Sequence, residues 1–222
     1  MAAPKKQLLQ LTAYEYIKNK ITMCEYAPNQ ILSESVIQEE LGFSRTPVRD
    51  AISRLAQEGL LKVIPKCGIV VTDLTFSDIR MIFEVRALIE PYALRNYGVK
   101  LDTDEIVRFA KIFRDNLNRP LDWKMYQLDD QFHSMLISTL PNVYLHDVYS
   151  RIQTQNTRLR VMSVQHEIGR SIETCEEHLQ ITDACLAQDW EAAAQAMTHH
   201  LQRSKESSFE AILHGNIQTK FG

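Results

Sequence analysis

The stretch "GFSRTPVRDAISRLAQEGLL", residues 42–61, has the pattern of a short helix that begins and ends beside glycines. Ser44 suits the N-cap position, and Pro47 falls in the first turn, where its missing N–H costs little. Apolar residues then recur at helical spacing, which indicates that one side of the helix is buried. These residues are Val48, Ala51, Ile52 and Leu55. The opposite side is rich in arginine, and the flanking sequence indicates what such a face is for.

The flanking segments predict a winged helix-turn-helix. Residues 11–26 and 33–41 each show a helical apolar stripe, and Gly42 separates the second of them from the arginine-rich helix. Downstream, two β-branched runs at 61–64 and 69–72 are separated by Pro, Lys, Cys and Gly, which indicates a hairpin. Two helices that are joined by a tight turn and followed by a hairpin form this motif, whose second helix enters the DNA major groove.

Helical geometry places the arginines of this helix on one outward face. With about 100° per residue and Arg45 at 0°, Arg49 falls near 40° and Thr46 near 100°, opposite the apolar side. This N-terminal end of the helix meets base edges in the motif, and an arginine–guanine pair is the commonest specific contact. A helical hairpin with a merely solvated face is the alternative. Residues at the flank and at the wing tip suit phosphates or the minor groove, and they are Arg54, Lys66 and Gly68.

The run "SRTPVRDAISRLAQEGLL" followed by "KVIPKCGIVVTDL" closely resembles the DNA-binding domain of the GntR superfamily of bacterial transcription regulators. The resemblance covers about residues 8–74 and includes "APNQILSE", with Asn29 where a glycine is commoner. It implies that Arg45 and Arg49 contact DNA. The family often has an arginine where this chain has Ser35, so one usual DNA contact is missing or replaced. The resemblance therefore does not imply the operator sequence.

Composition separates the chain into a basic front and an acidic back. Residues 1–72 hold nine Lys or Arg and seven Asp or Glu, whereas residues 73–222 hold sixteen and twenty-one. A small nucleic-acid reader joined to a different module has this asymmetry. No apolar run approaches the roughly 20 residues that span a bilayer, and no signal peptide is evident. The four cysteines form no C-x-x-C pair. We expect a cytoplasmic protein with reduced thiols and no membrane partner.

Residues beyond 74 predict only helices. The fold class is therefore mostly α, with a winged helix-turn-helix in residues 1–74 and an antiparallel all-α bundle of about six helices in residues 75–222. The segment at 73–78 is the expected linker. The expected helices are 76–96, 102–117, 121–139, 142–166, 171–187 and 189–214.

Four metal-binding residue types lie on the inward stripes of three of these helices. Asp129 and His133 are four residues apart on one helix, and His178 and His200 follow on two others. A buried imidazole or carboxylate needs a partner, and a shared divalent cation, Zn²⁺ or Ni²⁺, would satisfy all four. The alternative is that each is separately hydrogen-bonded, which we assign to the remaining candidates. These are Asp130, His146, His166, His199 and His214.

The segments "FEVRALIEPYA", "YQLDDQFHSML" and "EEHLQITDACLAQDWEAAAQAMTHHL" resemble the all-helical FCD ligand-binding domain of the FadR-like branch of the superfamily. Metal-binding members supply an Asp-x-x-x-His pair and two later histidines. The resemblance thus implies that Asp129, His133, His178 and His200 are metal ligands. Six helices rather than seven point to the shorter VanR-like subgroup.

Three arginines are candidates for binding an effector. Arg86 lies on an otherwise apolar stripe, so its partner is a protein carboxylate, Glu84 or Glu90, or a carboxylate of a ligand. The matching arginine of the family often faces the effector pocket. Arg158 and Arg160, in "NTRLRVMS", are weaker candidates for the same role.

These observations predict a transcription regulator, a repressor by our interpretation, that binds a near-palindromic operator as a homodimer. A small carboxylate effector would bind beside the metal and shift the equilibrium between dimer geometries. Two alternatives remain, a regulator for which the ion itself is the signal and a metal-dependent hydrolase. The hydrolase is disfavoured because the chain has no H-E-x-x-H motif and no evident general base beside the four residues.

Overall fold

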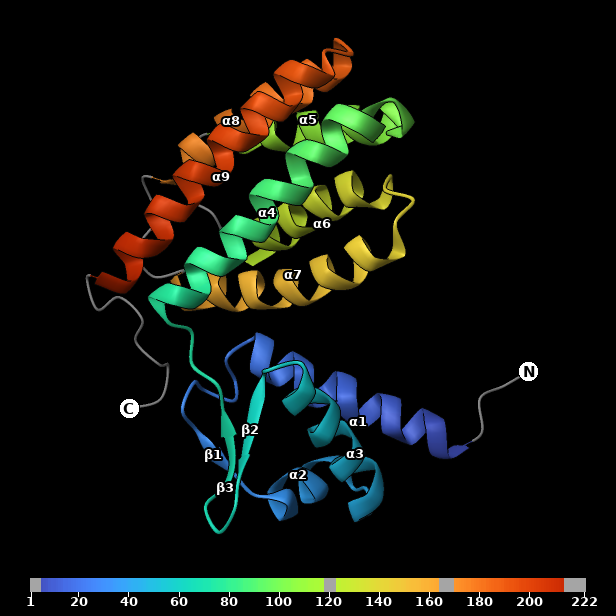
Figure 1. The fold of residues 1–222 in the computed structure, drawn as a ribbon, viewed down its shortest axis with the longest axis vertical. Helices are drawn as coiled ribbons and strands as arrows, with labels where there is room; N and C mark the ends of the chain where they lie inside the picture. The colour runs from blue at the N-terminus through green and yellow to red at the C-terminus, as the bar shows by residue number, and fades with distance from the viewer. Residues whose placement is uncertain (1–4, 118–122, 164–169, 214–222) are drawn as a thin grey trace. The chain divides into compact units, whose positions relative to one another are not determined.

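The computed structural model describes residues 5–117, 123–163 and 170–213. The chain divides into two compact units between Leu74 and Thr75 (Figure 1). Each unit has its own secondary structure. Among the residues with described positions, no helix is both long enough and apolar enough to cross a membrane.

The first unit has the element order of a winged helix-turn-helix, as the sequence predicts. Ser33 caps the second helix by accepting a hydrogen bond from the Val36 backbone N–H at 3.3 Å. Gly42 ends that helix with a positive φ of 65°, which a glycine adopts without strain. The elements are α1 (Lys5–Thr22), β1 (Ile31–Leu32), α2 (Glu34–Leu41), α3 (Arg45–Gln57), β2 (Leu61–Ile64) and β3 (Gly68–Val71).

The wing contains one more strand than the sequence predicts. Its antiparallel sheet has the order β1-β3-β2, with Leu32 opposite Ile69 and Leu61 opposite Val71. Strand β1 has only two residues, which is too short for an alternating pattern to appear in the sequence. Gly68 has a φ of 121°, and a Cβ there would lie 3.0 Å from the carbonyl oxygen of Leu32. A side chain at this position would therefore be strained, and glycine avoids that strain.

The core of the first unit fixes the direction in which α3 faces. Helix α1 packs against α3, and the contact buries apolar side chains of both helices and of the sheet. The side of α3 that the sequence predicts to be inward is buried, so its arginine-rich side faces outward. The buried side chains of α3 are Pro47, Val48, Ala51, Ile52 and Leu55.

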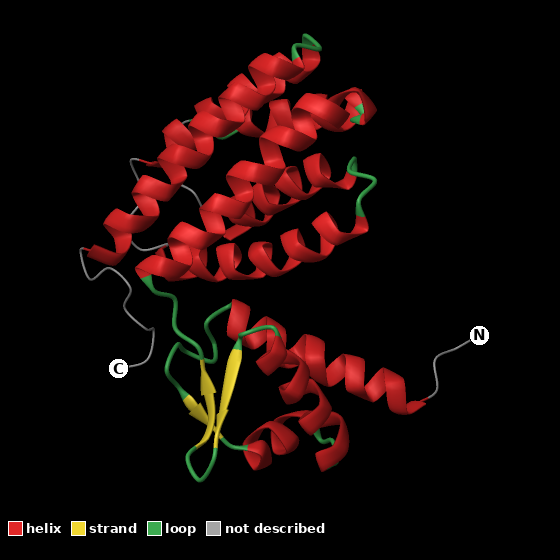
Figure 2. Cartoon of the chain, in the orientation of Figure 1, coloured by secondary structure: helices red, strands yellow, loops and turns green. Residues whose placement is uncertain are grey.

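The second unit consists of helices, which the sequence predicts (Figure 2). Thr75 and Asp78 form a capping box at the start of the first of them. Parts of three predicted helices, residues 121–122, 164–166 and 214, lie outside the described residues, and they include His166 and His214. The described helices are α4 (Phe76–Tyr97), the short 3₁₀ helix η1 (Gly98–Lys100), α5 (Thr103–Asp115), α6 (Trp123–Ser138), α7 (Val143–Ser163), α8 (Arg170–Leu186) and α9 (Trp190–Leu213).

Helix packing in the second unit brings α6, α8 and α9 around a buried polar centre. Helix α9 packs against α4 and α8, α5 packs against α8, and α7 packs against α4 and α6. The rings of Phe109 and Phe113 stack with their centroids 6.0 Å apart, and the Phe132 ring meets both edge-to-face at 5.3 and 5.2 Å. The His178 imidazole stacks on Phe113 at 4.5 Å. An apolar wall thus holds a histidine of the polar centre in place.

Candidate nucleic-acid interface and metal centre

The N-terminal end of α3 presents an exposed basic face. The side chains of Arg45 and Arg49 are 68% and 61% exposed, and Thr46 is exposed between them. The adjacent Pro47 and Val48 are buried in the core of the unit. The three polar residues therefore lie together on one outward face, in the geometry that a major-groove reading helix requires.

A carboxylate that sequence reasoning missed joins the two arginines of this face. Glu34, the first residue of α2, accepts a hydrogen bond from Arg45 Nε at 2.9 Å through Oε2. Its other oxygen, Oε1, lies 3.1 Å from Arg49 Nε. Glu34 follows the N-cap residue of α2. The one feature of the sequence that could have indicated its contact with the arginines is the tight turn between α2 and α3, which returns the chain toward the start of α2.

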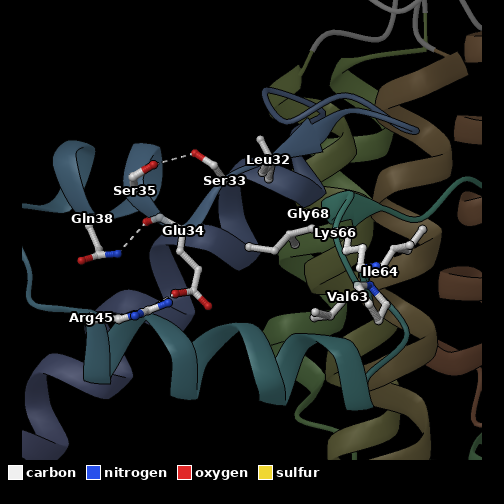
Figure 3. Close-up of a pocket in the computed structure, with 12 residues that line it drawn as sticks. Leu32, Ser33, Glu34, Ser35, Gln38, Arg45, Val63, Ile64, Lys66 and Gly68 are labelled. Atoms are coloured by element: carbon white, nitrogen blue, oxygen red, sulfur yellow. Dashed lines mark hydrogen bonds and ion pairs between the residues drawn. The ribbon is translucent and has the colours of Figure 1, made fainter.

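A groove of about 650 Å³ separates the start of α2 from the wing (Figure 3). Arg45 borders it on one side, and Lys66 and Gly68 border it at the wing tip. Ser35, which replaces a usual arginine of the GntR superfamily, lines it too, with its hydroxyl 2.9 Å from that of Ser33. The groove thus brings together residues that the sequence places in separate elements.

Arg54 lies apart from this groove. It is exposed near the C-terminal end of α3, and its guanidinium lies over the Tyr14 ring, 4.1 Å from the centroid. A cation–π contact of this kind holds the side chain while the charge stays accessible.

The four candidate metal ligands converge in the second unit. Asp129 and His133 come from α6, His178 from α8 and His200 from α9, and one ligand atom of each lies within 4.8 Å of those of the other three. His178 Nε2 lies 3.2 Å from Asp129 Oδ1 and 3.4 Å from His133 Nε2. All four residues are buried. Three helices thus bring one carboxylate and three imidazoles to a single point.

Buried atoms of this cluster lack hydrogen-bond partners among the described residues. They include Asp129 Oδ2 and His200 Nε2. Asp129 Oδ2 does have an ionic partner, since it forms an ion pair with the Arg160 guanidinium. An unsatisfied buried acceptor is costly, and a cation that bonds to several of these atoms would remove the cost. The residues present therefore fit a divalent metal ion.

The protonation of the cluster also suits a metal. Burial lowers the pKa of His178 well below its ordinary value, and it lowers the pKa of His200 to about 4. Burial alone would raise the pKa of the Asp129 carboxyl, but the Arg160 guanidinium and the three histidines of the cluster together outweigh it and hold that pKa well below its ordinary value. Neutral imidazoles and an ionised carboxylate are the forms that bind a metal, and Zn²⁺ and Ni²⁺ accept such ligands.

Two glutamates orient two of the ligand histidines. Glu90 on α4 lies 2.7 Å from Nδ1 of His133, and Glu177 on α8 lies 2.8 Å from Nδ1 of His200. A carboxylate that accepts the Nδ1 proton leaves the lone pair on Nε2, which is the atom that faces the cluster. From the sequence, Glu90 was expected only as a possible partner for Arg86, and no pattern in the sequence singles out Glu177.

Arg86 has a protein carboxylate as its partner. Of the two alternatives, the partner is Glu90, whose Oε1 accepts from Arg86 Nε at 2.6 Å, whereas Glu84 is exposed. Arg86 also donates to Asn156 Oδ1 at 3.1 Å, and Tyr149 donates its hydroxyl to Glu90 at 2.9 Å. Burial lowers the pKa of Arg86, but Glu90 outweighs it and holds that pKa above its ordinary value. Arg86 and Glu90 thus form a buried, hydrogen-bonded ion pair beside His133.

The other two candidate arginines differ in how close they are to the cluster. Arg160 donates to Asp130 Oδ1 at 2.8 Å and forms an ion pair with Asp129, so it touches a candidate ligand directly. Arg158 is fully buried and donates to Gln155 Oε1 at 2.9 Å. The remaining described candidates stay outside the cluster, since His146 bonds to the Leu140 carbonyl oxygen and His199 is exposed.

Comparison with known proteins assigns both units. Residues 9–71 match the family model of bacterial regulatory proteins of the gntR family. Residues 81–203, more than half of the chain, match the FCD domain. The two matches correspond to the winged helix-turn-helix and to the helical unit that contains the cluster. They confirm the family that the sequence motifs predict, whereas the VanR-like subgroup stays a prediction.

Individual relatives agree with this assignment. The HTH-type transcriptional repressor RspR of Escherichia coli K12 is 27% identical over 198 residues, which cover 87% of this chain and 86% of the repressor. The structure of E. coli McbR/YncC has a TM-score of 0.78 at 17% identity and covers 96% of this chain and 100% of its own. The metal-free FCD domain of TM0439 has a TM-score of 0.57 at 18% identity and covers 64% of this chain and 99% of its own. The chain belongs to the GntR family of bacterial regulatory proteins and is a DNA-binding transcription regulator, not an enzyme, with an FCD domain as its second unit.

Proposed function

We propose that this regulator is a repressor whose affinity for its operator is controlled by a small organic acid bound beside a divalent metal in the FCD domain. The buried cluster of Asp129, His133, His178 and His200 carries this proposal, because it brings four metal-binding groups together and contains buried polar atoms without hydrogen-bond partners among the described residues. The similarity to RspR, which is named as a repressor, supports the sign of the regulation.

On DNA, Arg45, Thr46 and Arg49 would read base edges in the major groove. Their exposure on one face of α3 supports this role. Lys66 and Gly68 at the wing tip would contact a phosphate or the minor groove, and they border the same groove as Arg45. Arg54, held over the Tyr14 ring, would contact a phosphate. In this arrangement the arginines of α3 supply sequence discrimination and the flanking residues supply position.

We expect Arg49→Ala to weaken operator binding by about 1–3 kcal/mol, because it removes one arginine that contacts a base. Fluorescence anisotropy at constant salt would measure this change. Arg108→Ala, which removes an exposed arginine from α5, is the control for net charge and should leave operator binding unchanged. Equal affinities for wild type and Arg49→Ala would exclude α3 as the reading helix.

A second copy of this chain would complete the DNA-binding form. Helix α4 exposes Met81, Leu88 and Tyr92, which are 48%, 69% and 42% exposed and share one stripe of the helix. An exposed apolar stripe of this kind supports association between copies. A two-fold dimer would present two α3 helices to half-sites about one helical turn apart, which matches a near-palindromic operator.

The metal would be held by Asp129, His133, His178 and His200, with Zn²⁺ or Ni²⁺ as the ions that suit these ligands. When bound, it would supply a positive charge that attracts a carboxylate. Arg160 is the arginine best placed to bind the same effector, because it already contacts Asp129. All three arginines have partners within the protein, Arg86 with Glu90, Arg158 with Gln155 and Arg160 with Asp129 and Asp130, so an effector would have to share or displace them.

The glutamate that orients His200 provides a test of the metal site. We expect Glu177→Gln to lower metal affinity by about 10- to 100-fold, because the Nδ1–H of His200 loses its charged acceptor. Competition with a chromogenic chelator would measure the affinity. Glu173→Gln is the matched control, since Glu173 lies one turn earlier on α8, is exposed and contacts the same Arg203. If the two variants bind metal equally well, Glu177 does not support the site.

The proposed function as a whole is tested with labelled DNA from upstream of this protein's own gene. Anisotropy titration at stated salt, against scrambled DNA of equal length, should show tight binding to the first DNA alone. Small organic acids should then release the metal-loaded protein from it. If operator affinity instead follows the addition and chelation of Zn²⁺ with no effect of any acid, the ion itself is the signal. Equal binding to both DNAs at every condition would contradict the proposal.

A further inference from the structure

The contact between Glu34 and the reading arginines suggests a role for this carboxylate. Each of its oxygens serves one guanidinium, Oε2 serving Arg45 at 2.9 Å and Oε1 serving Arg49 at 3.1 Å. The Glu34 side chain is 27% exposed, whereas both arginines are more than 60% exposed. The carboxylate therefore lies at the base of the basic face, and the arginines extend beyond it toward solvent. Figure 3 shows Glu34 and Arg45 pointing toward each other at the edge of the groove.

We propose that Glu34 determines the specificity of DNA binding, by weakening the attraction of Arg45 and Arg49 to phosphates while it aligns both for base edges. This proposal rests on the proposed function, in which the two arginines read the operator. It assigns Glu34 a positioning role, since the carboxylate acts through the guanidinium groups that it holds.

The Glu34 carboxylate lowers the positive charge of the groove. Non-specific affinity for DNA depends on how many phosphates the protein neutralises. Of the residues that line the groove, Arg45 and Lys66 are cationic, and Glu34 is the anionic one. The Glu34 carboxylate therefore cancels half of the positive charge along the groove. Glu34 Oε2 lies 2.9 Å from Arg45 Nε, so a phosphate that approaches Arg45 is also repelled by the Glu34 carboxylate.

The Glu34 carboxylate also aligns the two arginine side chains. Both contacts to Glu34 use Nε, which is the nitrogen closest to the backbone. The two terminal nitrogens of a guanidinium are sufficient for the bidentate contact with O6 and N7 of guanine. Each arginine can therefore keep its contact with Glu34 while it reads a base. An arginine that is held at Nε loses fewer side-chain conformations when it binds DNA, so binding costs less entropy. This saving favours only those sequences whose base edges fit the guanidinium in its held position.

The local structure holds Glu34 in this position. Ser33 caps the helix immediately before it, and the Gln38 side chain donates to the Glu34 backbone carbonyl oxygen at 3.1 Å. The neighbouring position carries Ser35, whose hydroxyl lies 2.9 Å from the Ser33 hydroxyl and adds no charge. Hence the carboxylate has the arginines of α3 as its cationic partners among the described residues.

The test compares Glu34→Gln with wild type on two DNAs. The probes are the upstream fragment that wild type binds best and a scrambled duplex of equal length, each titrated at several salt concentrations. We expect affinity for the scrambled duplex to rise about threefold to tenfold and its salt slope to steepen by about 0.9, as for one additional phosphate contact. Affinity for the upstream fragment should change less than threefold, so the ratio of the two affinities falls.

Glu39→Gln is the matched control, because Glu39 lies on the same helix, is exposed and loses the same charge. Glu34→Asp keeps the charge on a shorter side chain, and we expect a partial loss of discrimination; it also serves as the second variant if Glu34→Gln does not fold. Equal gains on both DNAs, or Glu34→Gln behaving like Glu39→Gln, would show that Glu34 only contributes net charge and would overturn the proposal. Wild type that fails to discriminate between the DNAs would instead refute the proposed function itself.

Discussion

Replacing His178 by alanine is expected to abolish stable metal binding by the FCD domain. His178 is the central residue of the cluster, since its Nε2 lies 3.2 Å from Asp129 Oδ1 and 3.4 Å from His133 Nε2. Without His178, the cluster keeps Asp129 and His133 on α6 and His200 on α9 but has no ligand from α8. The loss of affinity should exceed the roughly 10- to 100-fold that follows from removing a residue that only orients a ligand.

Elemental analysis of the purified protein after dialysis would measure this effect. Wild type should retain close to one ion per chain and His178→Ala almost none, while both remain dimers by light scattering. His199→Ala is the matched control, because His199 is exposed beside His200 on α9. We also expect His178→Ala to lose the response of operator binding to organic acids. Full occupancy in His178→Ala would refute the ligand set.

The periodicity of the sequence was sufficient to find the four residues of the cluster. Each lies on an apolar stripe of its own helix, and such a stripe indicates an inward direction whatever the neighbouring helices are. Their convergence depends on how α6, α8 and α9 pack, which a single helical pattern does not determine. The resemblance to the FCD domain supplied that information in advance of the structure.

The residues that support the sites were harder to predict, because their contacts join distant parts of the chain. Glu90 is 43 residues from His133, and Glu177 is 23 residues from His200. Glu177 has no local pattern that distinguishes it from an exposed helical glutamate, and the position of Glu90 four residues after Arg86 does not indicate its contact with His133. Glu34 is similar, since only the turn between α2 and α3 brings it to Arg45 and Arg49.

Arg86 shows where a local rule did decide between alternatives. A residue four positions later on a helix lies on the same side, whereas one two positions earlier does not. Glu90 stands at the first of these positions and Glu84 at the second, and Glu90 is the partner that the structure contains. The helical position thus favoured Glu90 over Glu84, but it did not decide between a carboxylate of the protein and one of a ligand. The complete burial of the pair depends on α7, which covers it with Tyr149 and Asn156.

Breaking this buried pair gives the second large effect that we expect. Glu90 is fully buried and accepts hydrogen bonds from Arg86 and Tyr149, besides its contact with His133. Glu90→Gln would leave the Arg86 guanidinium buried without a compensating charge. Removing one partner of such a pair costs about 3–5 kcal/mol, so we expect the free energy of unfolding to fall by roughly that amount.

Urea denaturation of the metal-free protein would measure this loss. Glu105→Gln is the matched control, because Glu105 pairs with Arg108 on the surface of α5 at 2.7 Å and should cost at most about 1 kcal/mol. Arg86→Met combined with Glu90→Gln should recover much of the stability, since the uncompensated charge is then absent.

Burial raises the pKa of Glu90, but Arg86 and His133 outweigh it and hold that pKa below its ordinary value. The stability from Glu90 is therefore present above the unfolded pKa of about 4.3 and is lost as the pH falls below it, so the difference between Glu90→Gln and wild type should shrink there. A Glu90→Gln variant as stable as Glu105→Gln would show that the pair contributes no more than a surface ion pair does.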